Sequence, residues 1–244
     1  MLRYAYSTQK ILCSIPSEMK PFTYLIIDLG CIFFPFLFSF ISYKAFYKEW
    51  KHFIPANLLV AFVFIVWDYY FTEIGVWGFN PEYLTGIYLG NLPLEEVLFF
   101  ICIPYACVFT YFALTHFLTK TTKKTPLTQV IMAVVFLVIG ITQYEKLYTA
   151  VTFIALAVYL FFSVAMRIHQ TQPLIGYACI LPFFLLANGL LTGSFLEAPI
   201  VWYNDAENLD IRLFTIPVED AFYGMLLILM NVNLYEYFKR KFTS

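Results

Sequence analysis

Seven long apolar stretches constrain what this chain can fold into. A helix needs about 20 apolar residues to cross the hydrocarbon core of a bilayer. The stretches cover 22–43, 53–72, 95–118, 127–143, 147–166, 173–195 and 214–238. Only 13% of the 244 residues are charged and 61% are apolar, whereas a soluble domain carries about 25% charged residues. We therefore predict an all-α integral membrane protein with about seven transmembrane helices.

The composition gives no support for several classes of ligand. The net charge is −1, which offers no basis for nucleic-acid binding, and no Gly-rich phosphate-binding loop follows a strand pattern. The five cysteines form no CxxC pair and lie mostly in apolar runs, so disulfide and zinc sites have weak support. We predict a protein with no cofactor and no metal site.

Lysine and arginine residues alternate between the loops. Ten of the fifteen basic residues follow the first, third, fifth and seventh stretches: Lys44, Lys48, Lys51, Lys120, Lys123, Lys124, Arg167, Lys239, Arg240 and Lys241. Cytoplasmic loops of membrane proteins carry an excess of Lys and Arg. We therefore predict a multi-pass protein of the cell (inner) membrane, with the N-terminus outside and the C-terminus in the cytoplasm.

Two short acidic motifs lie 124 residues apart, each at the start of an apolar stretch. They are Pro-Leu-Glu-Glu at 93–96 and Pro-Val-Glu-Asp at 217–220. The spacing indicates two parallel three-helix repeats joined by an extra helix, and parallel repeats are a known membrane architecture. We predict an N-terminal tail at 1–21 with Met19 as an alternative start, repeats at 22–118 and 147–240, a linker with the extra helix at 119–146, and a tail at 241–244.

The acidic motifs have two interpretations. Proline and acidic residues are favoured in the first turn of a helix, so each motif can simply open a helix at a wet interface. The alternative is acid–base chemistry, because carboxyl groups at membrane depth are costly and usually kept for function. Consecutive helical side chains point about 100° apart, so only one acid of each pair can face the bundle. The candidates are Glu95, Glu96, Glu219 and Asp220.

Four further polar residues are candidates for supporting roles. Asp28 and Asp68 lie within apolar stretches, and Asn188 falls opposite Asp68 when the repeats are aligned. Each can act at the site or can satisfy an ordinary hydrogen bond between helices. Arg212 is expected to form an ion pair with an acid.

Aromatic residues gather in the two long loops that precede the acidic motifs. Trp77, Trp202 and Tyr203 fit an interfacial aromatic belt. They can also line a pocket in which the π-faces stabilise a cation. Asn80 lies in the first of these loops and is a candidate for substrate binding.

Several of these motifs resemble a known family. The runs WGFNPEYLTGIY at 77–88 and NLPLEEVLFF at 91–100 resemble the first domain of the small, non-flavin membrane lycopene cyclases. The runs NGLLTG at 188–193, PIVWYN at 199–204 and IPVEDAFYG at 216–224 resemble the partner domain. The resemblance covers roughly residues 22–238, so the chain is similar to a fused, single-chain cyclase.

The resemblance implies a substrate and a reaction. Lycopene would enter from the lipid, and its ψ-end groups would be closed to β-rings by a proton-initiated isomerisation that gives γ-carotene and then β-carotene. The four acids would exchange the proton, Asp68, Asn188 and Arg212 would orient them, and Trp77 and Trp202 would flank the cation. The implied partners are the carotenoid, membrane lipids and possible other enzymes of the pathway.

Three alternatives stay open at this stage. The first is a cyclase of the same family that makes other rings or acts on longer carotenoids. The second is a seven-helix transporter that uses the acids for ion coupling, although transport sites tend to lie near the membrane midplane. The third is a carotenoid-binding subunit without activity.

Overall fold

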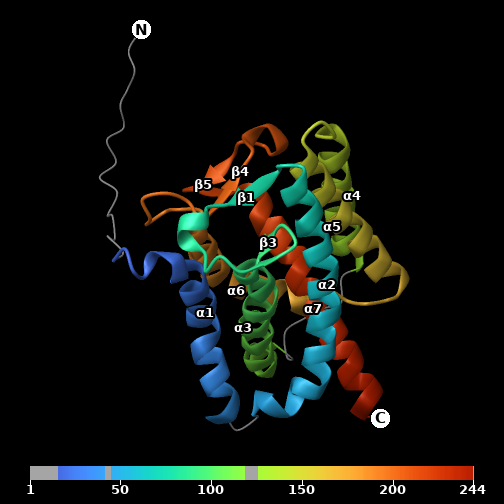
Figure 1. Cartoon of the computed structure of the whole chain (residues 1–244). Helices are drawn as coiled ribbons and strands as arrows, with labels where there is room; N and C mark the ends of the chain where they lie inside the picture. Colours follow the sequence, from blue (N-terminus) through green and yellow to red (C-terminus); the bar gives the residue numbers. More distant parts are fainter. Residues whose placement is uncertain (1–15, 42–44, 119–125, 244) are drawn as a thin grey trace.

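The computed structural model describes residues 16–41, 45–118 and 126–243, and most of them are helical (Figure 1). The long helices are α1 (Thr23–Ile41), α2 (Trp50–Glu73), α3 (Leu94–Leu118), α4 (Pro126–Thr142), α5 (Leu147–Ala165), α6 (Thr171–Leu191) and α7 (Val218–Thr243). Most of the predicted N-terminal tail and the basic residues Lys44, Lys120, Lys123 and Lys124 lie outside the described residues.

The helices confirm the predicted all-α membrane fold. Five of them, α1, α2, α3, α5 and α6, are long and apolar enough to cross a membrane. Helix α4 is shorter at 17 residues, and α7 has 26 residues but a more polar sequence. Large apolar side chains such as Phe34, Ile41 and Phe62 are exposed on helix surfaces, where a bilayer would cover them.

Two predicted helix boundaries are wrong by four residues, and a third, the end of α7 at Thr243 rather than 238, is wrong by five. Helix α6 ends at Leu191 rather than 195 because Gly193 adopts a left-handed φ of 88°. The Ser194 N–H donates to the Gly189 carbonyl and the Gly193 N–H to the Leu190 carbonyl, which is a Schellman termination. Helix α7 begins at Val218 rather than 214 because the preceding residues form a hairpin.

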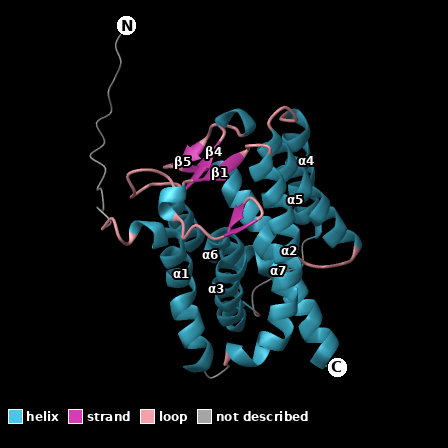
Figure 2. Ribbon diagram, in the orientation of Figure 1, coloured by secondary structure: helices cyan, strands magenta, loops and turns pink. Residues whose placement is uncertain are grey.

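Short strands form the connections before α3 and α7, and single 3₁₀ turns occur there and before α1 and α2. The strands are β1 (Trp77–Phe79), β2 (Tyr88–Leu89), β3 (Leu92–Pro93), β4 (Val201–Tyr203), β5 (Arg212–Leu213) and β6 (Ile216–Pro217). The 3₁₀ turns are Lys20–Phe22, Phe46–Glu49, Pro81–Tyr83 and Asp205–Glu207. All six strands gather at one end of the bundle, here called the strand end (Figure 2).

The two halves of the chain repeat each other, and most of their elements are offset by 124 residues. Helices α1 and α5, strands β1 and β4, and helices α3 and α7 each begin 124 residues apart. The offset changes only at α2 and α6, because the second repeat has a longer connection after its second helix. Helix α4 lies outside the repeat and packs beside α5 (Figure 1).

The strand pair β1–β4 joins the repeats. The strands are antiparallel, with Gly78 opposite Trp202 at the centre. Each end is extended by one further bond, from the Asn80 N–H to the Ile200 carbonyl and from the Asn204 N–H to the Val76 carbonyl. Since these bonds are also related by the 124-residue offset, the pair lies on the pseudo-twofold axis and holds the two acidic motifs at the same end of the bundle.

Small residues allow α4 to approach α5 closely. A Cβ atom added to Gly140 would lie 2.6 Å from the Ile154 side chain and 3.1 Å from the Ala150 carbonyl oxygen. Ala133 and Ala157 are also fully buried in this region. Small residues at helix interfaces are the usual way for membrane helices to pack by backbone contact.

Gly140→Leu is therefore expected to separate α4 from α5 and to lower stability by about 1–3 kcal/mol, the usual range for overpacking. The measurement is thermal unfolding of the detergent-solubilised protein. Val134→Leu, at an exposed position of the same helix, is the matched control and should leave the midpoint unchanged. Equal midpoints for both variants would show that the α4–α5 contact is not tight.

Candidate active site

A small polar cavity lies between the strand pair β1–β4 and the bundle. Its free volume is about 40 Å³. Three of the side chains that line it are carboxylic acids and eight are aromatic. The complete lining is Tyr24, Asp68, Trp77, Phe79, Glu96, Phe99, Tyr148, Phe184, Asn188, Leu191, Val201, Tyr203, Asp220 and Tyr223. Buried carboxyl groups enclosed by aromatic rings are unusual in a membrane protein, and they make this cavity the candidate functional site.

One acid from each motif faces this cavity, and each accepts a hydrogen bond from a tyrosine. The Tyr24 hydroxyl donates to Glu96 at 2.6 Å, and the Tyr148 hydroxyl donates to Asp220 at 2.7 Å. Both pairs are buried. Tyr24 and Tyr148 are 124 residues apart, as are Glu96 and Asp220, so the cavity contains two symmetry-related tyrosine–carboxyl pairs.

The surroundings of the two acids differ in spite of this symmetry. Asp220 also accepts hydrogen bonds from the Asn188 amide at 2.8 Å and the Tyr203 hydroxyl at 2.9 Å. Burial and the charge of Asp220 raise the pKa of Tyr203 well above its usual value, so Tyr203 remains a neutral donor. Three donors therefore stabilise an ionised Asp220.

Glu96 has acidic neighbours instead of additional donors. Asp68 lies in the same cavity, at the position that corresponds to Asn188 in the other repeat. Asp28 is buried one helical turn below Tyr24, and its two oxygens have no hydrogen-bond partner among the described residues. Both Asp28 and Asp68 are close enough to Glu96 for charge repulsion. Neighbouring carboxylates repel one another when all are ionised, whereas the residue beside Asp220 that corresponds to Asp68 is the neutral amide of Asn188.

The other acid of each motif faces away from the cavity lining and holds a loop. Glu95 accepts the backbone N–H of Thr85 at 2.7 Å. Glu219 accepts the backbone N–H of Leu209 at 2.8 Å and the Thr149 hydroxyl at 2.6 Å. The two N–H donors are again 124 residues apart. Glu95 and Glu219 therefore fix the loops that carry the strands above the cavity, and neither side chain lines the cavity.

The chain matches the model of one protein family. The family model described as lycopene cyclase matches residues 21–114 and 145–238, which together are more than half of the chain. The chain belongs to the lycopene cyclase family. No curated protein and no solved structure matches it.

The aromatic lining of this cyclase-family cavity is tightly packed. The Trp77 ring meets the Tyr148 ring edge-on at 5.1 Å and the Tyr223 ring at 6.1 Å. The Tyr148 and Tyr203 rings stack at 5.9 Å with an angle of 14° between their planes. The π-faces and tyrosine oxygens make the interior suitable for a transient carbocation.

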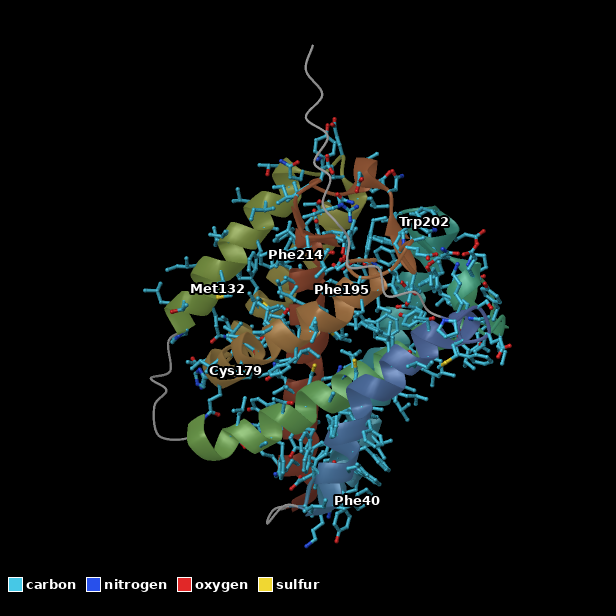
Figure 3. All side chains as sticks on the ribbon, turned by 90° about the vertical axis from the view of Figure 1, so that its left-hand side faces the viewer. Phe40, Met132, Cys179, Phe195, Trp202 and Phe214 are labelled. Atoms are coloured by element: carbon cyan, nitrogen blue, oxygen red, sulfur yellow. The ribbon has the colours of Figure 1, made fainter. Side chains whose placement is uncertain are left out.

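Three predicted site residues of the cyclase have other surroundings. Trp202 does not flank the cavity with Trp77: it is 44% exposed, and its ring covers Gly78 on the outer face of β1 (Figure 3). Strand alternation turns its neighbours Val201 and Tyr203 inward instead. Arg212 forms an ion pair with Asp205 and donates to the Thr215 carbonyl, which lowers the pKa of Asp205.

Asn80 is the third of these residues. Its side chain accepts the Glu82 N–H and caps the 3₁₀ turn Pro81–Tyr83. Asn204 caps the equivalent turn in the second repeat. Asn80 is not among the residues that line the cavity, so its role is to shape the loop.

Sequence reasoning missed the tyrosines Tyr24, Tyr148 and Tyr223 and the ring of Phe184. The 124-residue offset that separates the acidic motifs also relates Tyr24 to Tyr148, so that offset could have identified this pair. No similar signal exists for Phe184, which reaches the cavity from the middle of α6. Among the described residues, no three His, Cys, Asp or Glu side chains are grouped to hold a metal ion.

Proposed function

We propose that this protein is a lycopene β-cyclase that closes the ψ-end groups of lycopene by acid–base catalysis without a redox step. The observation that carries the proposal is that two carboxyl groups, one from each repeat, face one cavity lined by aromatic rings. Membership of the lycopene cyclase family supports the substrate class. Cyclisation is an isomerisation, so a proton donor, a proton acceptor and a dry pocket suffice.

The unequal surroundings of the two acids support a division of roles. Glu96 is the donor in our proposal, because its acidic neighbours Asp28 and Asp68 favour the protonated form. Asp220 is the base, because Tyr148, Tyr203 and Asn188 all donate hydrogen bonds to it. A pair of titratable groups whose environments differ in this way is typical of acid and base partners.

The proposed steps conserve atoms and charge. The C1=C2 π bond of the end group takes a proton from Glu96 at C2, which leaves a cation at C1. The C5=C6 π bond attacks C1, so the C1–C6 bond closes a six-membered ring with the cation at C5. Asp220 removes the C6 proton, and the electron pair of that C–H bond restores the C5=C6 double bond. One proton is added and one is lost. The proton that Asp220 takes up returns to Glu96 before the next cycle.

The aromatic lining contributes in two ways. Rings of Trp77, Tyr148 and Tyr223 present negative π-faces to the cations at C1 and C5. The same rings exclude water, which would otherwise trap either cation as an alcohol. The substrate already resides in the lipid around the bundle, so no aqueous transfer is needed.

Expression of this chain alone in a bacterial host that accumulates lycopene is expected to produce β-carotene, with γ-carotene as the one-ended intermediate. Pigment analysis by chromatography and absorption spectra measures the products. A product whose ring double bond lies at a different position would revise only which proton Asp220 removes. Unchanged lycopene, with the protein present in the membrane, would refute the proposed activity.

Glu96→Gln and Asp220→Asn are each expected to reduce cyclised product by at least about 100-fold, the usual contribution of a general acid or base. The amides keep the size and polarity of the acids but neither donate nor accept the proton. Product per amount of membrane protein is the measurement.

The matched controls are the neighbouring acids of the same motifs. Glu95→Gln retains an acceptor for the Thr85 N–H and should keep activity within a fewfold of wild type, as should Glu219→Gln. Glu95→Ala removes that acceptor and should lower thermal stability by about 1–3 kcal/mol. Loss of activity in Glu95→Gln together with full activity in Glu96→Gln would mean that Glu95, and not Glu96, donates the proton.

We propose further that the strand end lies outside the cell membrane and the C-terminus in the cytoplasm. Basic residues favour the cytoplasmic side. Lys48 lies just before α2 and Lys51 in its first turn, Arg167 follows α5 and Arg240 lies in the last turn of α7, and these helix ends are opposite the strands (Figure 1). The described basic residues at the strand end are Lys20, Lys146 and Arg212. A C-terminal fluorescent reporter that folds only in the cytoplasm should be bright, and a C-terminal phosphatase that is active only outside should be inactive. The reverse pattern would invert the protein in the membrane.

A further inference from the structure

An apolar crevice opens between α1, α3 and α6, below the candidate active site. Its walls include Cys31 of α1, Ile103, Ala106 and Cys107 of α3, and Ile180 and Ala187 of α6. Its free volume is about 220 Å³, compared with about 40 Å³ for the polar cavity. Figure 3 views the molecule from the side on which these three helices face outward.

The crevice meets both the lipid and the polar cavity. On the outer side its rim includes Phe183 and Leu186, which are 71% and 58% exposed. On the inner side its wall is the ring of Phe184, which also lines the polar cavity. Among the described residues, Phe184 is the one that lines both the crevice and the polar cavity.

Phe184 packs against a glycine of the next helix in the same repeat. A Cβ atom at Gly224 of α7 would lie 2.5 Å from the tip of the Phe184 ring. A larger residue at position 224 would displace the ring. The absence of a side chain at Gly224 leaves room for the ring to sit at the junction between the two spaces.

The crevice has the shape of a slot along the helices. Its α3 wall extends from Ile103 to Thr110 and its α6 wall from Ile180 to Leu190. At 1.5 Å per residue these walls are about 10 and 15 Å long. A slot of this length and of apolar lining fits a rigid, linear hydrocarbon better than a compact ligand.

The second repeat does not reproduce the small residues that form the slot. The residues 124 positions after Ala106 and Cys107 are Met230 and Asn231. Asn231 is fully buried and accepts a hydrogen bond from the Asn57 amide. The pseudo-twofold symmetry is therefore broken at these positions, where larger side chains of α7 pack against α2.

We propose that the α1–α3–α6 crevice binds the polyene arm of the substrate while its end group occupies the polar cavity, with Phe184 at the junction. This inference rests on the proposed function for the identity of the ligand, a linear apolar polyene. Because the acids line the polar cavity on the other side of Phe184 from the slot, each end group reaches them only after the chain has been threaded in from the lipid. Cyclisation of the second end then requires the molecule to leave and re-enter in the opposite direction.

The test fills the crevice without touching the acids. Ala106→Phe and Cys31→Phe introduce rings from two different walls, so a folding defect in one variant does not remove the test. Ala113→Phe, at an exposed position of α3 outside the crevice, is the matched control. Membrane amounts are compared for all variants.

Two readouts separate the crevice from the proposed activity. In the lycopene-accumulating host, Ala106→Phe and Cys31→Phe should each reduce cyclised product at least tenfold, while Ala113→Phe stays within twofold of wild type. In a Glu96→Gln background, where turnover is absent in any case, the lycopene that co-purifies with the protein should fall at least fivefold with Ala106→Phe and remain unchanged with Ala113→Phe.

The outcomes are distinguishable. If the wild-type protein leaves lycopene unchanged, the proposed function fails. The amount of co-purified lycopene then tests by itself whether the crevice binds a polyene. Cyclisation and lycopene retention that are unaffected by both crevice variants would overturn the inference. A loss of co-purified phospholipid with unchanged lycopene would also overturn it, because the occupant would then be a lipid acyl chain.

Discussion

Carboxyl groups can be held at membrane depth only if the protein itself supplies their polar partners, because the hydrocarbon core contains no water to do so. Glu95, Glu96, Glu219 and Asp220 are all buried, and each accepts at least one hydrogen bond from the same repeat. Most features of the strand end follow from this requirement. The loops return to the helix starts so that backbone N–H groups reach Glu95 and Glu219, and the tyrosines of α1 and α5 reach Glu96 and Asp220.

Because the unit is repeated, the arrangement that buries these acids occurs twice and produces a paired site. Each repeat supplies one buried acid that accepts a hydrogen bond from a loop N–H. It also supplies one inward acid, which faces the cavity and accepts a hydrogen bond from a tyrosine. The β1–β4 pair places the two inward acids at the same cavity. Symmetry alone would give two equal groups, but Asp68 and Asp28 in the first repeat correspond to Asn188 and Thr152 in the second. A few such exchanges are enough to give the two acids different surroundings.

The same departure from symmetry appears in packing. Ala106 and Cys107 leave a slot in the first half, whereas Met230 and Asn231 fill the equivalent region in the second. Duplication explains why two acids meet, and divergence between the copies explains why their surroundings, and the access from the lipid, are not equivalent.

The sequence by itself determined the class of fold and the location of the acids. Apolar length predicted the membrane helices, most of them to within about three residues, because spanning length is a one-dimensional property. The 124-residue spacing of the two motifs predicted the parallel repeat, and the 100° helical rotation predicted that only one acid of each pair faces inward.

Only the tertiary structure decided which acid that is and what surrounds it. Glu95 and Glu219 look equivalent to their neighbours in sequence, and they are separated by hydrogen bonds to Thr85 and Leu209 that depend on how the loops fold back. Trp77 and Trp202 look alike as well, but strand register turns one inward and the other outward. The contribution of Phe184 depends on helix packing across the repeats, a contact between residues far apart in the chain that local patterns do not encode.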